Sequence, residues 1–531
     1  MDCVMPSSNL NQLPATETPP PRSVGVIDVG STSIRMAIAE IDDQHGVRIL
    51  ETLTQTVNLG KDAFTRGRIR KTTTEECVGA LKRYRRKLEE YQIVDDKNIR
   101  VVATSAVREA ENRLAFLDRV YVATGLEITA IDEAEVSRIT YSGIQRFFWA
   151  EPELATANTV VTEVGGGATE VLLVKNGNVH FSHTYRLGSQ RIRKSLQSQP
   201  TSSSKLREMM ETRIRHTVQQ VVSHVPQSGR NVMIGIGGDI RFAAQQLHPN
   251  WPADTMLRVP LEWLEQFTQM ILESTEDELV HRYHLSFPDA ETLGPALLTY
   301  LELARSLNLQ QIRVSNANLR DGLLQEMAVG EAWTDEFRNQ VIRSAIALGR
   351  NYSFDEPHAQ HVAELSVQLF LQLADRHRLG RSFEVILHVA ALLHEIGAYV
   401  SSRSLHKHSM YLIRNSEVFG LGARQLLLVA LVARYHRRAS PQPNHDVYGN
   451  LPLDERVAVS QLAAILRVAI ALDEARQQRI EEFTIDWDGG KLIISVPRIE
   501  DLSIEQLAMS QHASLFEEVF GTRVVLRSVR A

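Results

Sequence analysis

Two short glycine-containing segments carry residue types that suit phosphate chemistry. The first reads D-V-G-S-T-S from Asp28, and the second reads E-V-G-G-G-A-T-E from Glu163. Glycines let the backbone approach an anion closely and turn its N–H groups toward it, and hydroxyl groups add further donors. A carboxylate cannot bind phosphate directly, so the acidic residue before each loop is a candidate ligand of a divalent cation.

A third segment, G-I-G-G at 235–238, also ends an apolar run in glycines. Each loop alone is typical of a tight hairpin, but two loops of one layout and a third glycine segment favour a phosphate-binding cleft. The candidate phosphate-binding residues of the three segments are Gly30, Ser31, Thr32, Ser33, Gly165, Gly166, Gly167, Thr169, Gly237 and Gly238.

Apolar runs rich in β-branched residues flank each loop. Residues 24–41 and 159–177 each predict a strand, a glycine turn and a returning strand. Helical periodicity follows at 73–91 and 109–124. Three such glycine units separated by helices predict two α/β subdomains around a cleft.

The pattern changes near residue 330. Residues 331–479 show almost only helical periodicity, and the final segment returns to β-rich runs with an Asp-Gly-Gly hairpin signal. We therefore expect five parts in chain order. They are a disordered leader (1–22), two α/β subdomains (23–145 and 146–330), an all-α domain (331–480) and a small α+β domain (481–531).

Composition excludes several classes of protein. The 58 Lys and Arg against 64 Asp and Glu give a net charge of −6, which argues against binding of duplex DNA. No apolar run reaches the roughly 18 residues of a transmembrane helix, so we expect no membrane association. Only Cys3 and Cys77 occur, so the sequence holds no disulfide framework, and we expect a cytoplasmic protein.

The glycine segments resemble those of the exopolyphosphatase/guanosine pentaphosphate phosphohydrolase (Ppx/GppA) family. The resemblance rests on VIDVGSTSIRM, VATSAVREAEN, EVGGGATEVLLV, GIGGDIRF and VSNANLRDGLL, and on helical segments such as AALLHEIGAYVSSRSLHKHSMYLI and LRVAIALDEAR. It runs in the family's order over roughly residues 24–479. It implies a duplicated actin-like (ribonuclease H-like) ATPase core, followed by an all-α domain of the HD type and a small α+β cap.

The resemblance also implies an activity, which is Mg²⁺-assisted hydrolysis of a terminal phosphoanhydride. The substrate it implies is inorganic polyphosphate or, as the alternative, the 5′-terminal phosphate of pppGpp. By the same resemblance, Asp28, Glu163 and Glu170 are expected metal ligands, Asp28 and Glu170 are catalytic carboxylates, and Arg108 binds phosphate. We further expect a homodimer, since the C-terminal domains could bury a two-fold interface.

One departure from the family pattern concerns the residue that activates water. The family segment I-S-G-x-E-E-A-R corresponds here to I-D-E-A-E-V-S-R at 131–138, which puts Val136 at the catalytic glutamate position. Valine cannot accept a proton, so Glu135 or Glu133 is the expected replacement. A third reading follows, in which the protein binds polyphosphate or an alarmone and hydrolyses it weakly.

The helical region has a constellation of its own. His358, the pair His394-Glu395 and Asp473 follow the order of metal-dependent phosphohydrolases of the His-Asp type, with glutamate in place of the first aspartate. In the resembling family this domain is generally a binding platform. We therefore expect core-packed polar residues without a metal here.

Basic runs at 82–87, 406–408 and 434–438 supply cationic density suited to a long polyphosphate chain. Within the last run we assign Arg437 and Arg438 to substrate binding.

Overall fold

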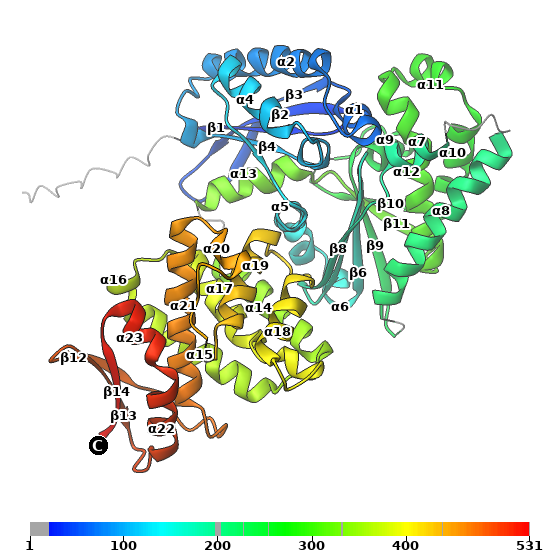
Figure 1. The fold of residues 1–531 in the computed structure, drawn as a ribbon. Coiled ribbons are helices and arrows are strands. Elements are labelled where there is room, and N and C mark those ends of the chain that lie inside the picture. Colours follow the sequence, from blue (N-terminus) through cyan, green and yellow to red (C-terminus); the bar gives the residue numbers. More distant parts are fainter. Residues whose placement is uncertain are drawn as a thin grey trace, which may run out of the picture.

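The computed structural model places two α/β halves first, then a helical domain and a small C-terminal sheet (Figure 1), in the predicted order. It describes residues 21–196, 203–226, 228–252, 254–330, 333–437 and 439–529. Residues 1–20 of the predicted leader lie outside the described residues, and the first strand begins at Arg22.

The first half is built on a five-stranded sheet of order β3-β2-β1-β4-β5. Its strands are β1 (Arg22–Val29), β2 (Ser33–Ile41), β3 (Val47–Thr56), β4 (Ile99–Ala103) and β5 (Ile128–Ala130). β1, β2 and β3 are antiparallel, whereas β4 and β5 run parallel to β1. The helices of this half are α1 (Leu59–Arg66), α2 (Lys71–Glu90), α3 (Ser105–Arg108) and α4 (Arg113–Thr124), so the helix predicted at 109–124 starts later than expected.

The second half repeats this topology. Its sheet has the order β10-β11-β9-β6-β7-β8, in which β8, β7, β6, β9 and β11 correspond to β3, β2, β1, β4 and β5 in order and direction. The strands are β6 (Asn158–Val164), β7 (Thr169–Lys175), β8 (Asn178–Tyr185), β9 (Asn231–Ile236), β10 (Met256–Pro260) and β11 (Gln311–Ser315). The helices are α6 (Pro152–Thr156), α7 (Ser189–Leu196), α8 (Ser203–His224), α9 (Gly238–Leu247), α10 (Leu261–Glu273), α11 (Glu276–Tyr283) and α12 (Phe287–Ser306).

Two helices join the halves. α5 (Glu133–Ala150) crosses the boundary predicted at residues 145 and 146, and it packs against α13 (Leu319–Val329) on the first sheet. The crossing is close, because a Cβ at Gly322 would lie 2.0 Å from the Ile139 carbonyl oxygen. A helix from the end of the second half therefore covers a sheet of the first half.

The helical domain and the C-terminal sheet share one core. The helices are α14 (Asp335–Asn351), α15 (Glu356–Gln372), α16 (Ala374–His377), α17 (Arg381–Leu393), η2 (Ile396–Tyr399), α18 (Leu405–Arg414), α19 (Ala423–Arg434), α20 (Asp446–Gly449) and α21 (Leu453–Leu472). The last segment has β12 (Thr484–Asp488), β13 (Lys491–Pro497), α22 (Ser503–His512), α23 (Ser514–Phe520) and β14 (Arg523–Val529). β12 and β13 form the predicted hairpin.

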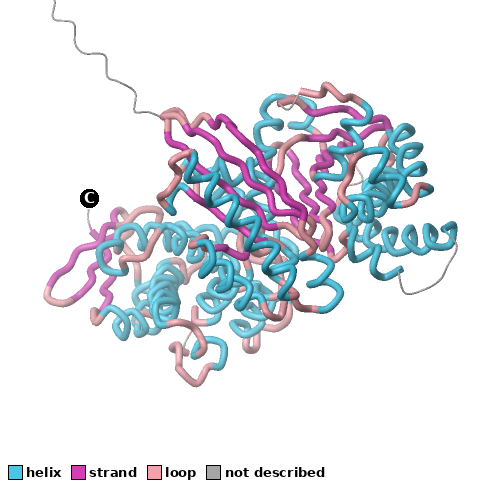
Figure 2. Tube along the Cα trace, turned by 90° about the horizontal axis from the view of Figure 1, so that it is seen from above, coloured by secondary structure: helices cyan, strands magenta, loops and turns pink. Residues whose placement is uncertain are grey.

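Seen from above (Figure 2), the strands of the two large sheets form two neighbouring groups, and the small sheet lies apart near the C-terminus. Among the described residues, no helix has the length and apolar character needed to cross a bilayer.

Candidate active site

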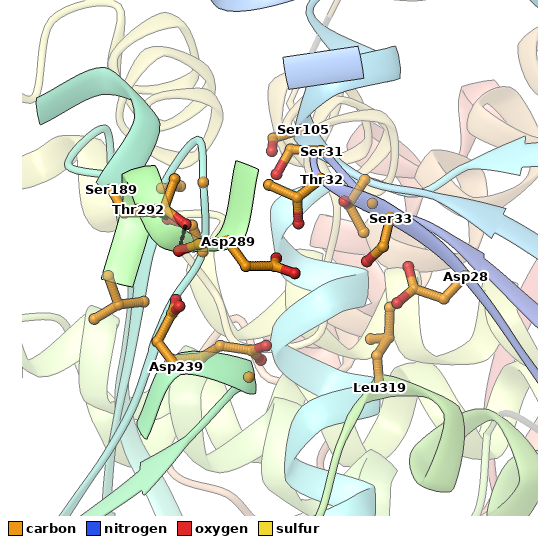
Figure 3. Close-up of a pocket in the computed structure, with 18 of the residues that line it drawn as sticks. Asp28, Ser31, Thr32, Ser33, Ser105, Ser189, Asp239, Asp289, Thr292 and Leu319 are labelled. Atoms are coloured by element: carbon orange, nitrogen blue, oxygen red, sulfur yellow. Dashed lines mark hydrogen bonds between the residues drawn. The ribbon is translucent and has the colours of Figure 1, made fainter. Parts of the chain in front are cut away.

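A cavity of about 270 Å³ is lined by residues from both α/β halves (Figure 3). The predicted phosphate-binding residues that line it are Gly30, Ser31, Thr32, Ser33, Arg108, Gly165, Gly166 and Gly238. The predicted metal ligands Asp28, Glu163 and Glu170 line the same cavity. The structure thus brings together residues that lie more than 200 positions apart in the sequence.

The two hairpin loops have the same hydrogen bond. The Gly30 N–H donates to the Ser33 carbonyl over 2.9 Å, and the Gly165 N–H donates to the Ala168 carbonyl over 2.8 Å. The loops also face each other, because a Cβ on Gly166 would lie 2.4 Å from the Ser31 Oγ. A side chain at Gly166 would therefore collide with the opposite loop.

Three of the phosphate-binding residues predicted in the glycine segments do not line this cavity. Gly167 packs under Phe64, and a Cβ there would lie 2.4 Å from the ring. The Thr169 hydroxyl donates to the Leu187 carbonyl. Gly237 has φ of 111°, which favours glycine, and it is the N-cap residue that precedes α9. All three therefore have local structural contacts rather than a place in the cavity lining.

The carboxylates at the base of the loops are paired across their strands. Asp28 of β1 lies opposite Arg35 of β2, whereas Glu163 of β6 lies opposite Glu170 of β7. Burial raises the pKa of Asp28, and burial together with the Glu163 charge raises the pKa of Glu170 well above its usual value. One oxygen of Asp28 and one of Glu170 are buried without a hydrogen-bond partner.

These carboxylates fit a hard divalent cation. Asp28, Glu163 and Glu170 supply oxygen donors, and two of the donor atoms have no protein partner. Their oxygens are too far apart to surround an ion by themselves. Among the described residues, a single group of three ligand side chains has its donor atoms within 4.8 Å of one another, and that group lies in the helical domain. A Mg²⁺ ion here would keep several water or phosphate oxygens as ligands.

Four arginines balance this acidic group. Arg35 and Arg108 line the cavity, and Arg320 lies 3.7 Å from the Asp28 carboxylate. Burial raises the pKa of Glu163, and the positive charge of Arg241 offsets part of that rise. Only Arg108 is among the sequence predictions. Arg35, Arg241 and Arg320 lie inside segments that carry the family resemblance, a few residues after a glycine or asparagine loop. That position could have identified them from the sequence.

The helix α5 does not supply either of the expected replacement glutamates to the cavity. The Glu135 carboxylate accepts a hydrogen bond from the Asp132 backbone N–H over 3.1 Å, and the Asp132 carboxylate accepts one from the Glu135 backbone N–H over 3.0 Å. These two hydrogen bonds form a capping box at the start of the helix. Glu133 is exposed and forms an ion pair with Arg108 at 3.2 Å. Val136, which is 5% exposed, lines the cavity.

The structure adds a carboxylate that the sequence reasoning missed. Asp239 lies in the first turn of α9 and lines the cavity. Figure 3 shows the carboxyl groups of Asp28, Asp239 and Asp289 around the same space. Burial, with the charge of Asp289, raises the pKa of Asp239 to about 7. Asp239 directly follows the glycine pair Gly237-Gly238, and this position could have identified it as a site residue from the sequence.

A second cavity, of about 350 Å³, adjoins the first at Arg108. It lies between α5, β8 and the segment that joins α18 to α19. Its walls are mainly apolar on the side of the helical domain, where Val418, Phe419, Leu421 and Leu426 contribute.

The remaining predicted residues lie in the helical domain. Arg437 is exposed and lines neither cavity, and Arg438 lies outside the described residues. His358, His394 and Glu395 come together, with Asp473 hydrogen-bonded to His358 at 2.8 Å.

The sequence matches the Ppx/GppA phosphatase family over residues 37–331 and domain III of that family over residues 341–501. The chain belongs to the Ppx/GppA phosphatase family. The fold predicted from the sequence, an actin-like ATPase core with a helical domain and a small C-terminal sheet, is confirmed.

Similar proteins cover more than half of this Ppx/GppA chain. The guanosine-5′-triphosphate,3′-diphosphate pyrophosphatase of Vibrio vulnificus is 24% identical over a 486-residue alignment that covers 88% of this chain and 91% of that protein. The protein of the same name from Aeromonas hydrophila is 23% identical over 89% of this chain and 92% of its own length. The crystal structure of an exopolyphosphatase from Cytophaga hutchinsonii has a TM-score of 0.52 and 21% identity, and covers 59% of this chain and all of that chain.

Proposed function

We propose that this member of the Ppx/GppA family hydrolyses the terminal phosphoanhydride bond of inorganic polyphosphate, with water as nucleophile and Mg²⁺ as cofactor. One observation carries the proposal. Two matching glycine turns, one from each half of the core, face each other across a cavity whose walls hold both unpartnered carboxylate oxygens and arginines. Donors of this kind bind a phosphoryl group, and acceptors of this kind bind its cation.

The chain's own residues divide the work of positioning. The loop backbones and Arg108 hold the terminal phosphates, and Arg35 adds positive charge beside them. Asp28, Glu163 and Glu170 would hold the Mg²⁺. When bound, Mg²⁺ offsets the charge that develops on the transferring phosphoryl oxygens.

Water activation falls to a carboxylate outside α5. Asp239 is the best placed, because it lines the cavity and its pKa of about 7 leaves it partly ionised at neutral pH, where a general base works best. The water oxygen bonds to the terminal phosphorus as the anhydride P–O bond breaks. The water proton passes to Asp239, and the leaving oxygen stays on the shortened chain.

A second candidate substrate is pppGpp, and the adjoining cavity favours it. A cavity with one mainly apolar wall next to the phosphate site suits a purine nucleoside better than a polyanion. The names of the two relatives that cover most of the chain agree with this candidate.

Phosphate release measured on both substrates tests the proposal. We expect release that needs Mg²⁺, is abolished by EDTA and is lost in Asp28→Asn. Faster release from polyphosphate supports the first candidate, and faster release from pppGpp supports the second. Tight binding of either substrate without release in a single turnover would overturn hydrolysis and leave a binding protein.

A further inference from the structure

Five chemistry-bearing side chains converge inside the helical domain, and none of them lines the phosphate cavity. His358 lies in the first turn of α15, His394 and Glu395 follow α17, His436 follows α19, and Asp473 follows α21. The ends of four packed helices therefore meet at one point. Packing needs no such set of imidazoles and carboxylates, so their convergence calls for another explanation.

We propose that the helical domain binds one divalent first-row transition-metal ion, such as Zn²⁺, between His358, His394 and Glu395. One ligand atom from each of these three side chains lies within 4.8 Å of the other two. Two imidazoles and one carboxylate form a donor set typical of zinc, which leaves a further position open for another ligand.

The hydrogen bonds of the histidines orient them as metal ligands. The His358 Nδ1 lies 2.8 Å from the Asp473 carboxylate, and the His394 Nδ1 lies 2.6 Å from the Ala391 carbonyl oxygen. Both partners are acceptors, so each Nδ1 carries the proton and each Nε2 carries the lone pair. This arrangement is the usual outer support of a metal-bound histidine.

The His394 Nε2 is the second, independent sign of a ligand. The His394 Nε2 atom is buried and has no hydrogen-bond partner among the residues that the structure describes, and His394 is 1% exposed. A buried lone pair without a partner costs free energy, and a bound cation removes that cost.

Two neighbours complete the surroundings. The His436 ring lies 5.1 Å from the His394 ring, and its Nδ1 is 2.5 Å from the Ala433 carbonyl oxygen, so its Nε2 also keeps a lone pair. Arg476 donates to one oxygen of Glu395 over 2.7 Å, which leaves the other oxygen for the ion. Because the Glu395 side chain is 30% exposed, the ion can enter from this side.

Metal content and thermal unfolding of the full-length, untagged protein test the proposal. After dialysis against a chelator, we expect the wild type to take up one equivalent of Zn²⁺ tightly and to unfold at a higher temperature with it. His394→Gln and Glu395→Gln should lose both effects. Asp473→Asn should bind about 10- to 100-fold more weakly, because Asp473 positions His358 without binding the metal.

Two controls separate this site from other causes. His377 is also buried in the helical domain, but both of its ring nitrogens have backbone partners, so His377→Gln should keep the Zn²⁺. Glu170→Gln removes a phosphate-cavity carboxylate and should keep it as well. Co²⁺ bound in place of Zn²⁺ should show visible absorption in the wild type that is absent in Glu395→Gln.

The proposal is overturned if the folded wild type takes up no Zn²⁺, or if His377→Gln or Glu170→Gln loses as much metal as His394→Gln. Glu395→Gln keeps the test decisive if the buried His394 variant fails to fold. Failure of phosphate release would not bear on this site, because the readouts are metal uptake and stability.

Discussion

Glu163 and Glu170 are direct cross-strand neighbours on β6 and β7, whereas the corresponding positions of the first hairpin hold Asp28 and Arg35. Opposed like charges destabilise a sheet, and burial makes the cost larger. The wall of the cavity therefore holds a pair of carboxylates that favours the binding of a proton or a cation.

The first prediction concerns this pair. Glu170→Gln should raise the melting temperature of the metal-free protein by a few degrees at pH 8, because it removes one buried charge, and it should reduce the further rise caused by Mg²⁺. The raised pKa of Glu170 means that the folded state holds its proton more tightly than the unfolded state. Stability from this group is thus fully present below about pH 4 and is lost as pH rises, so the gain from the variant should vanish at low pH.

Differential scanning fluorimetry across pH, with and without Mg²⁺, measures this effect. Glu127→Gln is the matched control, because Glu127 is an exposed glutamate that does not line the cavity. An equal rise in melting temperature with Mg²⁺ in the wild type and in Glu170→Gln would show that Glu170 does not bind the metal.

The second prediction concerns the base. Asp239→Asn should slow single-turnover phosphate release by about 10²- to 10⁴-fold, the typical contribution of a positioned general base, and leave substrate binding in place. Val136→Glu in the same background should restore part of the rate, because Val136 lines the same cavity. An Asp239→Asn enzyme as fast as the wild type would exclude Asp239 as the base.

The third prediction is the pH profile of that step. Since the pKa of Asp239 is raised to about 7, its ionised fraction grows as pH rises toward 7 and levels off above it. The rate should climb about tenfold per pH unit on the acid side and then reach a plateau. Rates measured from pH 5 to 9 should lose this acid limb in Asp239→Asn, and persistence of the limb would assign it to another group.

The fourth prediction separates Glu135 from the chemistry. Because Glu135 completes the capping box of α5, Glu135→Ala should cost about 1 kcal/mol of stability without changing the rate of phosphate release. Asp132→Ala removes the other half of the box and should cost a similar amount. Urea unfolding measures the stability, and initial rates of phosphate release measure the activity. A large fall in rate at unchanged stability would show that Glu135 takes part in the reaction.

The sequence alone determined the features that depend on local backbone geometry. The glycine turns after Asp28 and Glu163, their flanking strands and the hairpin before the last helices follow from residue type and from short spacing. The same segments identified the family. Such features depend on only a few neighbouring residues, so they can be predicted without knowing what packs against them.

Tertiary structure decided which side chains reach the cavity. Glu135 and Val136 are adjacent in sequence, yet one caps its helix and the other lines the cavity, because rotation about the helix axis directs them differently. Arg320 reaches Asp28 only because α13 packs on the first sheet. These contacts are set by burial of apolar surface far from the groups themselves, so spacing along the chain does not reveal them.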